Sequence, residues 1–115
     1  MKSSKHYQKK IKEFADLLES VIPAEVTGDA YCQKYLSHLL DHRYYYLQIY
    51  AFLLKKMEQT LHKSLQDTRM VDYGSGNGLL GIFAAYCGCK EVMLHEQDAV
   101  FLESSQKLAS ILKTD

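Results

Sequence analysis

Apolar side chains recur every three or four residues over residues 4–22, which predicts a first amphipathic helix. Pro23, the single proline of the chain, ends this helix because the proline ring cannot continue the helical hydrogen-bond pattern. The connector over residues 23–29 supplies Thr27 or Asp29 as the N-cap of the next helix. The apolar face of the first helix consists of Tyr7, Ile11, Phe14, Leu17, Leu18 and Val21.

A longer helical pattern runs from about residue 30 to about residue 63 without a proline or a glycine. Such a pattern with leucines seven residues apart is typical of a coiled coil, but one amphipathic helix packed on a sheet gives the same spacing. Because the flanking charges that select a coiled-coil partner are sparse, we favour packing within the chain. The pattern also allows a break near Asp41 and His42. The leucines of the repeat are Leu40, Leu47, Leu54 and Leu61.

The second half of the chain alternates short apolar runs with helical ones. We expect a strand over residues 68–73, a glycine-rich turn, a helix over 79–86, a second strand over 91–95 and a helix over 99–113. Asp98 is the expected cap of the last helix. This order is that of a parallel βαβ unit extended by one helix.

The predicted fold class is α/β. Residues 1–66 form an N-terminal helical region of two helices, the second one long, and residues 67–115 form a partial Rossmann-like βαβα unit with parallel strands. Hydrophobic residues make up 47% of the chain, which suffices for a globular core. The 14 basic residues equal the 14 acidic ones, so no overall charge favours binding to nucleic acid.

Cysteine and histidine positions predict no metal site. The three cysteines are odd in number, and Cys87 and Cys89 lack the second pair of ligands that a zinc site needs. His38 and His42 have the spacing of zinc proteases without the glutamate between them. No apolar run has the length of a signal peptide or a membrane span, so we expect a cytoplasmic protein with buried or half-buried thiols and no membrane partner.

Four of the six glycines lie in the sequence VDYGSGNGLLG, which joins the first strand to its helix. In a strand–glycine–helix arrangement, backbone N–H groups and a helix N-terminus face a nucleotide-like ligand. One interpretation is the dinucleotide fingerprint Gly76-x-Gly78-x-x-Gly81, with Glu96 following as the acid that binds ribose. Asp72 would then end a strand that points at an anionic pyrophosphate, where an acid is unfavourable.

A second register, Asp72-x-Gly74-x-Gly76-x-Gly78 with Glu96 downstream, resembles the first motif and acidic second strand of class I S-adenosylmethionine-dependent methyltransferases. In that family the glycine loop passes under the methionine and ribose parts of the cofactor. The acid that opens the loop helps hold the cationic amino end of the cofactor, often through water. The acid that closes the second strand takes the ribose hydroxyls.

The resemblance therefore implies a binding site for S-adenosyl-L-methionine. Asp72 would open the loop, Glu96 would take the ribose hydroxyls, and Gln97 or Asp98 would border the adenosine. Because the cofactor carries a sulfonium and an ammonium, Asp72 would attract it and repel a pyrophosphate, so we prefer a methyltransferase to an NAD(P)-binding oxidoreductase. The implied cofactor-binding residues are Asp72, Gly74, Ser75, Gly76, Gly78, Glu96 and Gln97.

The resemblance covers residues 68–112 and ends there. A complete class I fold has a seven-stranded sheet, of which this chain supplies the first two strands, without the segments that contact adenine and substrate. This implies either a truncated piece of a longer enzyme or a chain that self-associates through its open sheet edges or its long helix. The catalytic residues and the methyl acceptor are unknown, and we expect the 115 residues alone to lack methyl-transfer activity.

Two features of the helical region leave other interpretations open. The long leucine-bearing helix also fits a non-catalytic interaction module that keeps a vestigial cofactor fold. In many methyltransferases N-terminal helices cover the cofactor, which would bring His42, Arg43 or a tyrosine of the segment HLLDHRYYYLQIY to the ligand. We favour ordinary packing for that segment. Its tyrosines are Tyr44, Tyr45, Tyr46 and Tyr50.

Overall fold

The computed structural model describes residues 4–114 and confirms the predicted α/β class. The two strands are parallel and are joined by a helix, as in a βαβ unit. In chain order the elements are α1 (Ser4–Leu18), α2 (Pro23–Val26), α3 (Ala30–Asp41), α4 (Arg43–Leu61), the short 3-10 helix η1 (Leu65–Asp67), β1 (Arg69–Tyr73), α5 (Leu79–Tyr86), β2 (Glu91–His95) and α6 (Ala99–Ile111).

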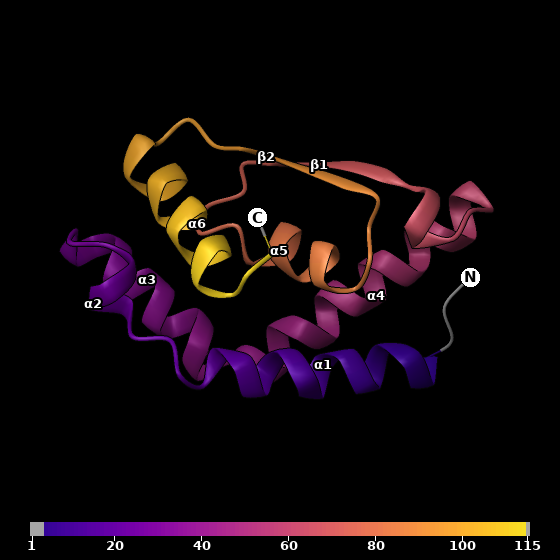
Figure 1. Ribbon diagram of the computed structural model, residues 1–115, viewed down its shortest axis with the longest axis horizontal. Coiled ribbons are helices and arrows are strands. Elements are labelled where there is room, and N and C mark those ends of the chain that lie inside the picture. The colour runs from indigo at the N-terminus through magenta and orange to yellow at the C-terminus, as the bar shows by residue number, and fades with distance from the viewer. Residues whose placement is uncertain (1–3, 115) are drawn as a thin grey trace.

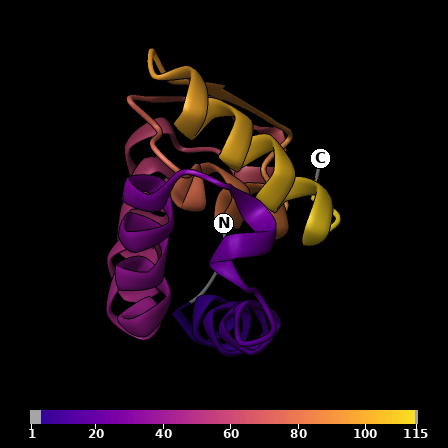
Figure 2. The ribbon, with the colours of Figure 1, turned by 90° about the vertical axis from the view of Figure 1, so that its left-hand side faces the viewer.

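The described helices lie on one side of the two-stranded sheet (Figure 1). Figure 2 shows α1 end-on at the bottom, with the sheet at the opposite side of the molecule. Alternate strand residues such as Met70 and Val92 therefore pack against the core. The intervening side chains of Val71, Tyr73 and Met93 are exposed, so one face of the sheet carries apolar groups open to solvent.

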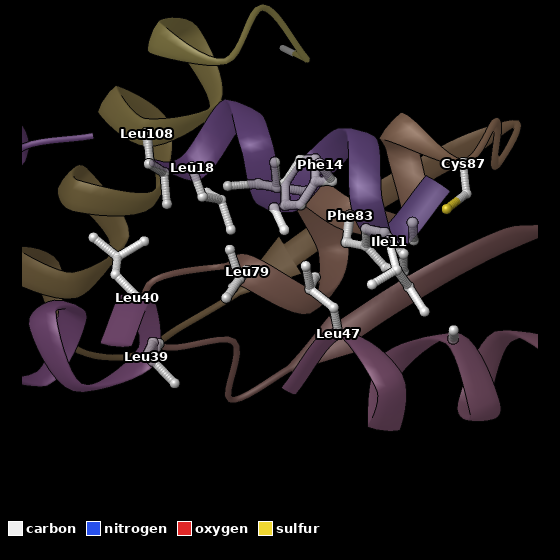
Figure 3. Packing of buried hydrophobic residues seen from close by; sticks show 14 of the residues in the cluster. Ile11, Phe14, Leu18, Leu39, Leu40, Leu47, Leu79, Phe83, Cys87 and Leu108 are labelled. Carbon is white, nitrogen blue, oxygen red and sulfur yellow. The ribbon is translucent and has the colours of Figure 1, made fainter. Parts of the chain in front are cut away.

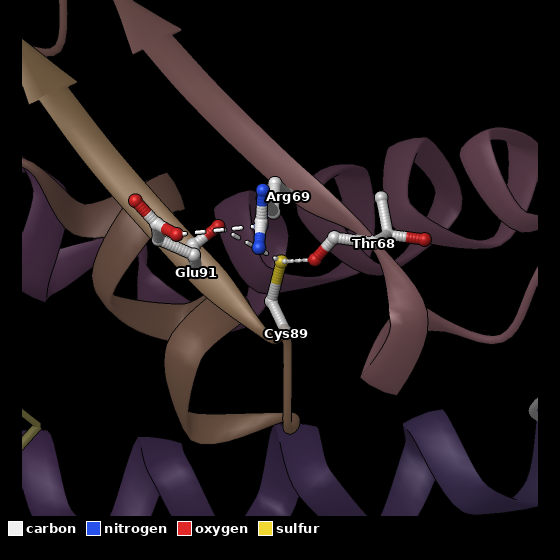
Figure 4. Close-up of polar contacts among 4 residues, drawn as sticks. All are labelled: Thr68, Arg69, Cys89 and Glu91. Atoms are coloured by element: carbon white, nitrogen blue, oxygen red, sulfur yellow. Dashed lines mark hydrogen bonds and ion pairs between the residues drawn. The ribbon is translucent and has the colours of Figure 1, made fainter.

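The amino ends of the strands are held together by polar contacts (Figure 4). Arg69 Nε lies 3.4 Å from a carboxylate oxygen of Glu91, which is its partner across the strands. Below them, the Cys89 thiol donates to the Thr68 carbonyl at 3.0 Å, and the backbone N–H of Lys90 donates to the same oxygen at 3.0 Å. The ion pair is exposed and contributes little to stability, whereas the half-buried hydrogen bonds to Thr68 fix the register of β1 against β2.

The expectation of one long second helix is wrong, and the break lies where the sequence allowed one: α3 and α4 are separated at His42. His42 has φ −114° and ψ 27°, outside the helical range. The guanidinium of Arg43 donates to the carbonyl of Leu40 at 3.0 Å and to that of Ala15 in α1 at 3.2 Å. Because Arg43 satisfies a carbonyl at the end of α3 and anchors α4 on α1, the chain turns here instead of continuing straight.

Two further bounds in the helical region differ from expectation. The first helix ends at Leu18, one turn before residue 22. The connector that follows contains the short helix α2, with Pro23 at its first turn, where a proline costs no hydrogen bond. Asp29 is the N-cap of α3, since its carboxylate accepts from the Cys32 N–H at 2.8 Å. From Ser4 onward, the N-terminal region thus contains four α-helices, not two.

The leucine repeat packs within the chain, as favoured because its flanking charges are sparse. Leu40, Leu47 and Leu54 are buried, and Leu61 is 50% exposed. Leu47 lies among side chains of α1 and α5, including Phe14 and Phe83 (Figure 3). Fully burying one such side chain stabilises the fold by about 1.5–3 kcal/mol, so this cluster is the main source of stability.

A buried polar link joins three elements of the helical layer. Glu58 of α4 is 1% exposed, and its carboxylate accepts from the Tyr7 hydroxyl of α1 at 2.8 Å and from the Leu65 N–H of η1 at 2.8 Å. Burial, reinforced by Glu58, raises the pKa of Tyr7 well above its ordinary value. Tyr7 therefore stays protonated and remains a hydrogen-bond donor.

The three cysteines are free thiols, Cys32 and Cys87 buried and Cys89 half-buried, as expected. Burial raises the pKa of the Cys89 thiol, so it stays protonated and unreactive at neutral pH. Within residues 4–114, no helix combines the length and the apolar character needed to cross a lipid bilayer.

Candidate functional site

The glycine loop lies where the carboxyl ends of β1 and β2 meet. The backbone N–H groups of Gly74 and Ser75 both donate to the carbonyl of His95, at 2.7 and 3.1 Å. The N–H of Gly78 donates to the carbonyl of Ser75 at 2.8 Å, which closes the turn into α5. The loop is therefore fastened to the end of β2 and leads directly into a helix N-terminus.

Three glycines of the loop have left-handed backbone conformations that a side chain disfavours: Gly74 (φ +70°), Gly76 (φ +57°) and Gly78 (φ +80°). The space around them differs. A Cβ at Gly78 would lie 2.8 Å from Ser105 Cβ, so this glycine serves packing against α6. Nothing lies within 4 Å of a Cβ at Gly74, and only Tyr35 Cε1, at 3.9 Å, approaches one at Gly76. The backbone of Gly74 and Gly76 is thus open to a ligand.

Glu96 is brought to this loop, as predicted. Its Oε1 accepts from the Gly76 N–H at 2.8 Å, and its Oε2 accepts from the Asp98 N–H at 3.0 Å. These bonds, first that from Asp98 and then that from Gly76, lower the pKa of the carboxyl. A carboxylate has about four acceptor positions, so Glu96 keeps room to accept hydrogen bonds from ligand hydroxyls.

Asp72 lies on the other strand, half-buried beneath the loop. Its Oδ2 accepts from the Gly81 N–H of α5 at 3.2 Å. Burial raises the pKa of Asp72, the bond from Gly81 opposes this, and the negative charge of Glu96 adds to the rise. The two carboxylates therefore interact electrostatically, and their combined negative charge favours a bound cation.

A cleft of about 280 Å³ opens beside the loop. Three of the predicted residues line it, and the rings of Tyr73 and His95 stack along one wall, with centroids 4.7 Å apart and planes at 6°. A larger hollow of about 710 Å³, between residues 24–29 and α6, contains none of the predicted residues. The cleft is lined by Tyr73, Gly74, His95, Glu96, Gln97 and Asp98.

The remaining predicted residues have distinct positions. Ser75 is half-buried, and its Oγ has no hydrogen-bond partner within residues 4–114. Asp98 caps α6, as predicted, since its carboxylate accepts from the N–H groups of Val100 at 2.9 Å and Phe101 at 3.4 Å. Gln97 is exposed at the mouth of the cleft.

Sequence reasoning missed Asn77, which anchors the loop from within. Asn77 is 1% exposed, and its Nδ2 donates to Ser104 Oγ of α6 at 3.0 Å and to Cys32 Sγ of α3 at 3.4 Å. Its Oδ1 has no partner in the described part of the chain. The available signal was an amide side chain between Gly76 and Gly78, a polar residue where small ones dominate.

The aromatic segment of residues 38–50 contributes to the break between α3 and α4 and to packing. Arg43 and His42 lie at the break, and the ring centroids of His42 and His38 are 4.6 Å apart. Burial raises the pKa of Tyr50 to about 12, and the negative charge of Asp72 adds to the rise. Among residues 4–114 no group of three or more side chains has the arrangement of a metal site.

Comparison of the chain with protein-family models, with curated proteins and with solved structures returned no significant match. The geometry of the loop and its two acids is therefore the basis on which a function can be proposed.

Proposed function

We propose that the chain is the cofactor-binding portion of an S-adenosylmethionine-dependent methyltransferase. The observation that carries this proposal is the placement of Asp72 and Glu96 on either side of a loop with two open glycines, Gly74 and Gly76. One acid with unused acceptor positions suits ribose hydroxyls, and the other suits a cationic amino end. The unpartnered Ser75 hydroxyl adds a polar contact at the same loop.

The dinucleotide alternative shares part of this geometry. A Cβ at Gly81 would overlap Leu94 and lie 3.0 Å from Val92 Cγ1, and close helix–strand packing is the role of the third glycine in the dinucleotide fingerprint. The glycine spacing is thus compatible with either cofactor. Asp72 distinguishes the two cofactors, because a second carboxylate in addition to Glu96 repels a pyrophosphate and attracts a sulfonium.

The interaction-module alternative loses its main support. Its basis was the leucine repeat, of which Leu40, Leu47 and Leu54 are buried inside the chain. A cytoplasmic location remains part of the proposal, in agreement with the free state of all three thiols.

The chemistry assigned to these residues is binding and orientation. When bound, the cofactor supplies an electrophilic methyl group for in-line displacement, a reaction promoted largely by positioning. Glu96 and the loop backbone would fix the ribose, and Asp72 would fix the cationic end. The methyl acceptor and the group that removes its proton are left to residues outside this site.

Calorimetric titration of the chain with S-adenosylmethionine, S-adenosylhomocysteine and NAD tests the proposal. Asp72→Ala should abolish or strongly weaken binding of S-adenosylmethionine, whereas Asp41→Ala, at an exposed position on α3, should leave it unchanged. Binding of NAD in preference to both adenosyl compounds, strengthened by Asp72→Ala, would replace a methyltransferase with an oxidoreductase.

A further inference from the structure

Helix α3 places an aromatic ring directly against the glycine loop. Tyr35 Cε1 lies 3.9 Å from the position that a Cβ at Gly76 would take. The same ring packs edge-to-face on Phe101 of α6, with centroids 5.5 Å apart and planes at 86°. Tyr35 is nevertheless 45% exposed, so the ring is held in place and still accessible beside the open backbone of the loop.

The loop also has an acid at its start. The Asp72 carboxylate is half-buried on β1, and its Oδ2 accepts from the Gly81 N–H of α5 at 3.2 Å. Asp72 precedes Gly74 by two residues, so the acid and the Tyr35 ring belong to the same strand–loop–helix turn.

We propose that Tyr35, over Gly76, lines the part of the cofactor site that binds the sulfonium. This inference rests on the proposed function and extends it to α3, whose Tyr35 precedes the tyrosine-rich segment of residues 38–50. It identifies the ligand chemistry of this wall as a cation with attached methyl or methylene groups.

The physical reason is that aromatic rings and a carboxylate stabilise a cation in different ways. A ring attracts a cation through its quadrupole and also packs against the apolar groups attached to it. The Asp72 carboxylate supplies the opposite charge in a half-buried position, where the attraction is stronger than in water. The site should therefore prefer the sulfonium of S-adenosylmethionine to the neutral thioether of S-adenosylhomocysteine.

The affinities of the full chain for these two compounds test the inference. Tyr35→Leu should weaken the binding of S-adenosylmethionine roughly 2- to 30-fold and that of S-adenosylhomocysteine distinctly less, because only the first carries the sulfonium charge. Tyr35→Phe keeps the ring and should bind like the wild type. Tyr44→Leu is the matched control, because Tyr44 is 48% exposed on α4 and its ring contacts Arg43.

A second measurement does not depend on how well the variants fold. In wild-type protein with S-adenosylmethionine labelled at its S-methyl group, nuclear Overhauser effects should connect that methyl with ring protons of Tyr35. Equal weakening of both compounds by Tyr35→Leu, or methyl contacts that exclude the Tyr35 ring, would overturn the inference and leave the proposed function standing. A wild-type chain that binds neither compound would overturn both.

Discussion

The Oε1 atom of Glu96 lies 2.8 Å from the backbone nitrogen of Gly76, and this hydrogen bond joins the end of β2 to the middle of the glycine loop. The second oxygen of the same carboxylate holds the Asp98 N–H, at the start of α6. One side chain thus connects a strand, a loop and a helix cap. The loop is held in place without a ligand, which lowers the loss of conformational entropy on binding.

Protonation of Glu96 should loosen this loop. Its pKa is lowered in the folded protein, so its stabilising contribution is complete above the ordinary value of 4.5 and is lost as the pH falls through the folded pKa. The amide resonance of Gly76 should therefore titrate with a midpoint below 4.5, as followed by NMR. Glu96→Gln should remove the titration, and a midpoint at or above 4.5 would contradict the role assigned to the two hydrogen bonds.

Asp72→Asn should stabilise the chain without ligand. The folded pKa of Asp72 is raised above 3.8, so stability from this group is present at low pH and is lost as the pH rises through the folded pKa. An asparagine cannot ionise and can still accept from the Gly81 N–H. We expect a gain of about 0.5–2 kcal/mol in the free energy of unfolding at pH 7, measured in urea, together with weaker binding of S-adenosylmethionine. A less stable variant would count against this account of the charge.

Gly81→Ala should destabilise the fold although alanine favours helices. The new Cβ would overlap Leu94 and press on Val92 Cγ1, forcing α5 away from β2. Overpacking of this kind costs about 1–3 kcal/mol, which denaturant unfolding can measure. Gly28→Ala is the control, because nothing lies within 4 Å of a Cβ there; its effect should stay within about 0.5 kcal/mol.

Tyr7→Phe should cost about 1–3 kcal/mol, because it removes a donor from a buried carboxylate oxygen of Glu58. The folded pKa of Tyr7 is raised above 10, so its contribution is complete below pH 10 and is lost at higher pH. Thermal unfolding between pH 8 and about pH 11 should therefore show a smaller alkaline loss in Tyr7→Phe than in the wild type. Tyr44→Phe, at an exposed position, should match the wild type at every pH.

Self-association of the chain stays a prediction, and the exposed face of the sheet offers a specific surface for it. Each strand of residues 4–114 has one neighbour, and Val71 and Met93 lie exposed on the uncovered face. We expect a second copy to cover this face, so that the mass measured by light scattering rises with concentration. The double variant Val71→Lys with Met93→Lys should remain a monomer. A wild-type mass independent of concentration would refute the expectation.

Local sequence signals were sufficient to predict the elements of the strand–loop–helix half of the chain. Helix α5 and strand β2 have the predicted bounds, and Asp98 caps α6, because apolar runs, glycines and a cap residue determine each of these over a few neighbouring positions. The predicted acids lie at the same end of the sheet because the carboxyl ends of parallel strands share one edge.

The features that the sequence left open or missed depend on contacts between distant residues. The sequence allowed the break at His42 without requiring it, because Arg43 also reaches the carbonyl of Ala15, 28 positions away. The anchoring of Asn77 involves Cys32, 45 positions away, and Ser104, 27 positions away. Tyr35 comes to Gly76 through the packing of α3 on α6, which the helical pattern of α3 does not specify.

Two glycines of the motif serve packing and two leave the backbone open, and this difference affects how the motif would change in evolution. Gly78 and Gly81 make room for neighbouring side chains, so selection for folding alone would preserve them after a ligand was no longer used. Gly74 and Gly76 have free space around them, and asparagine or aspartate tolerates their backbone conformation. In a lineage that lost the activity, those two positions would change first, while half of the glycine pattern persisted as a relic of the core.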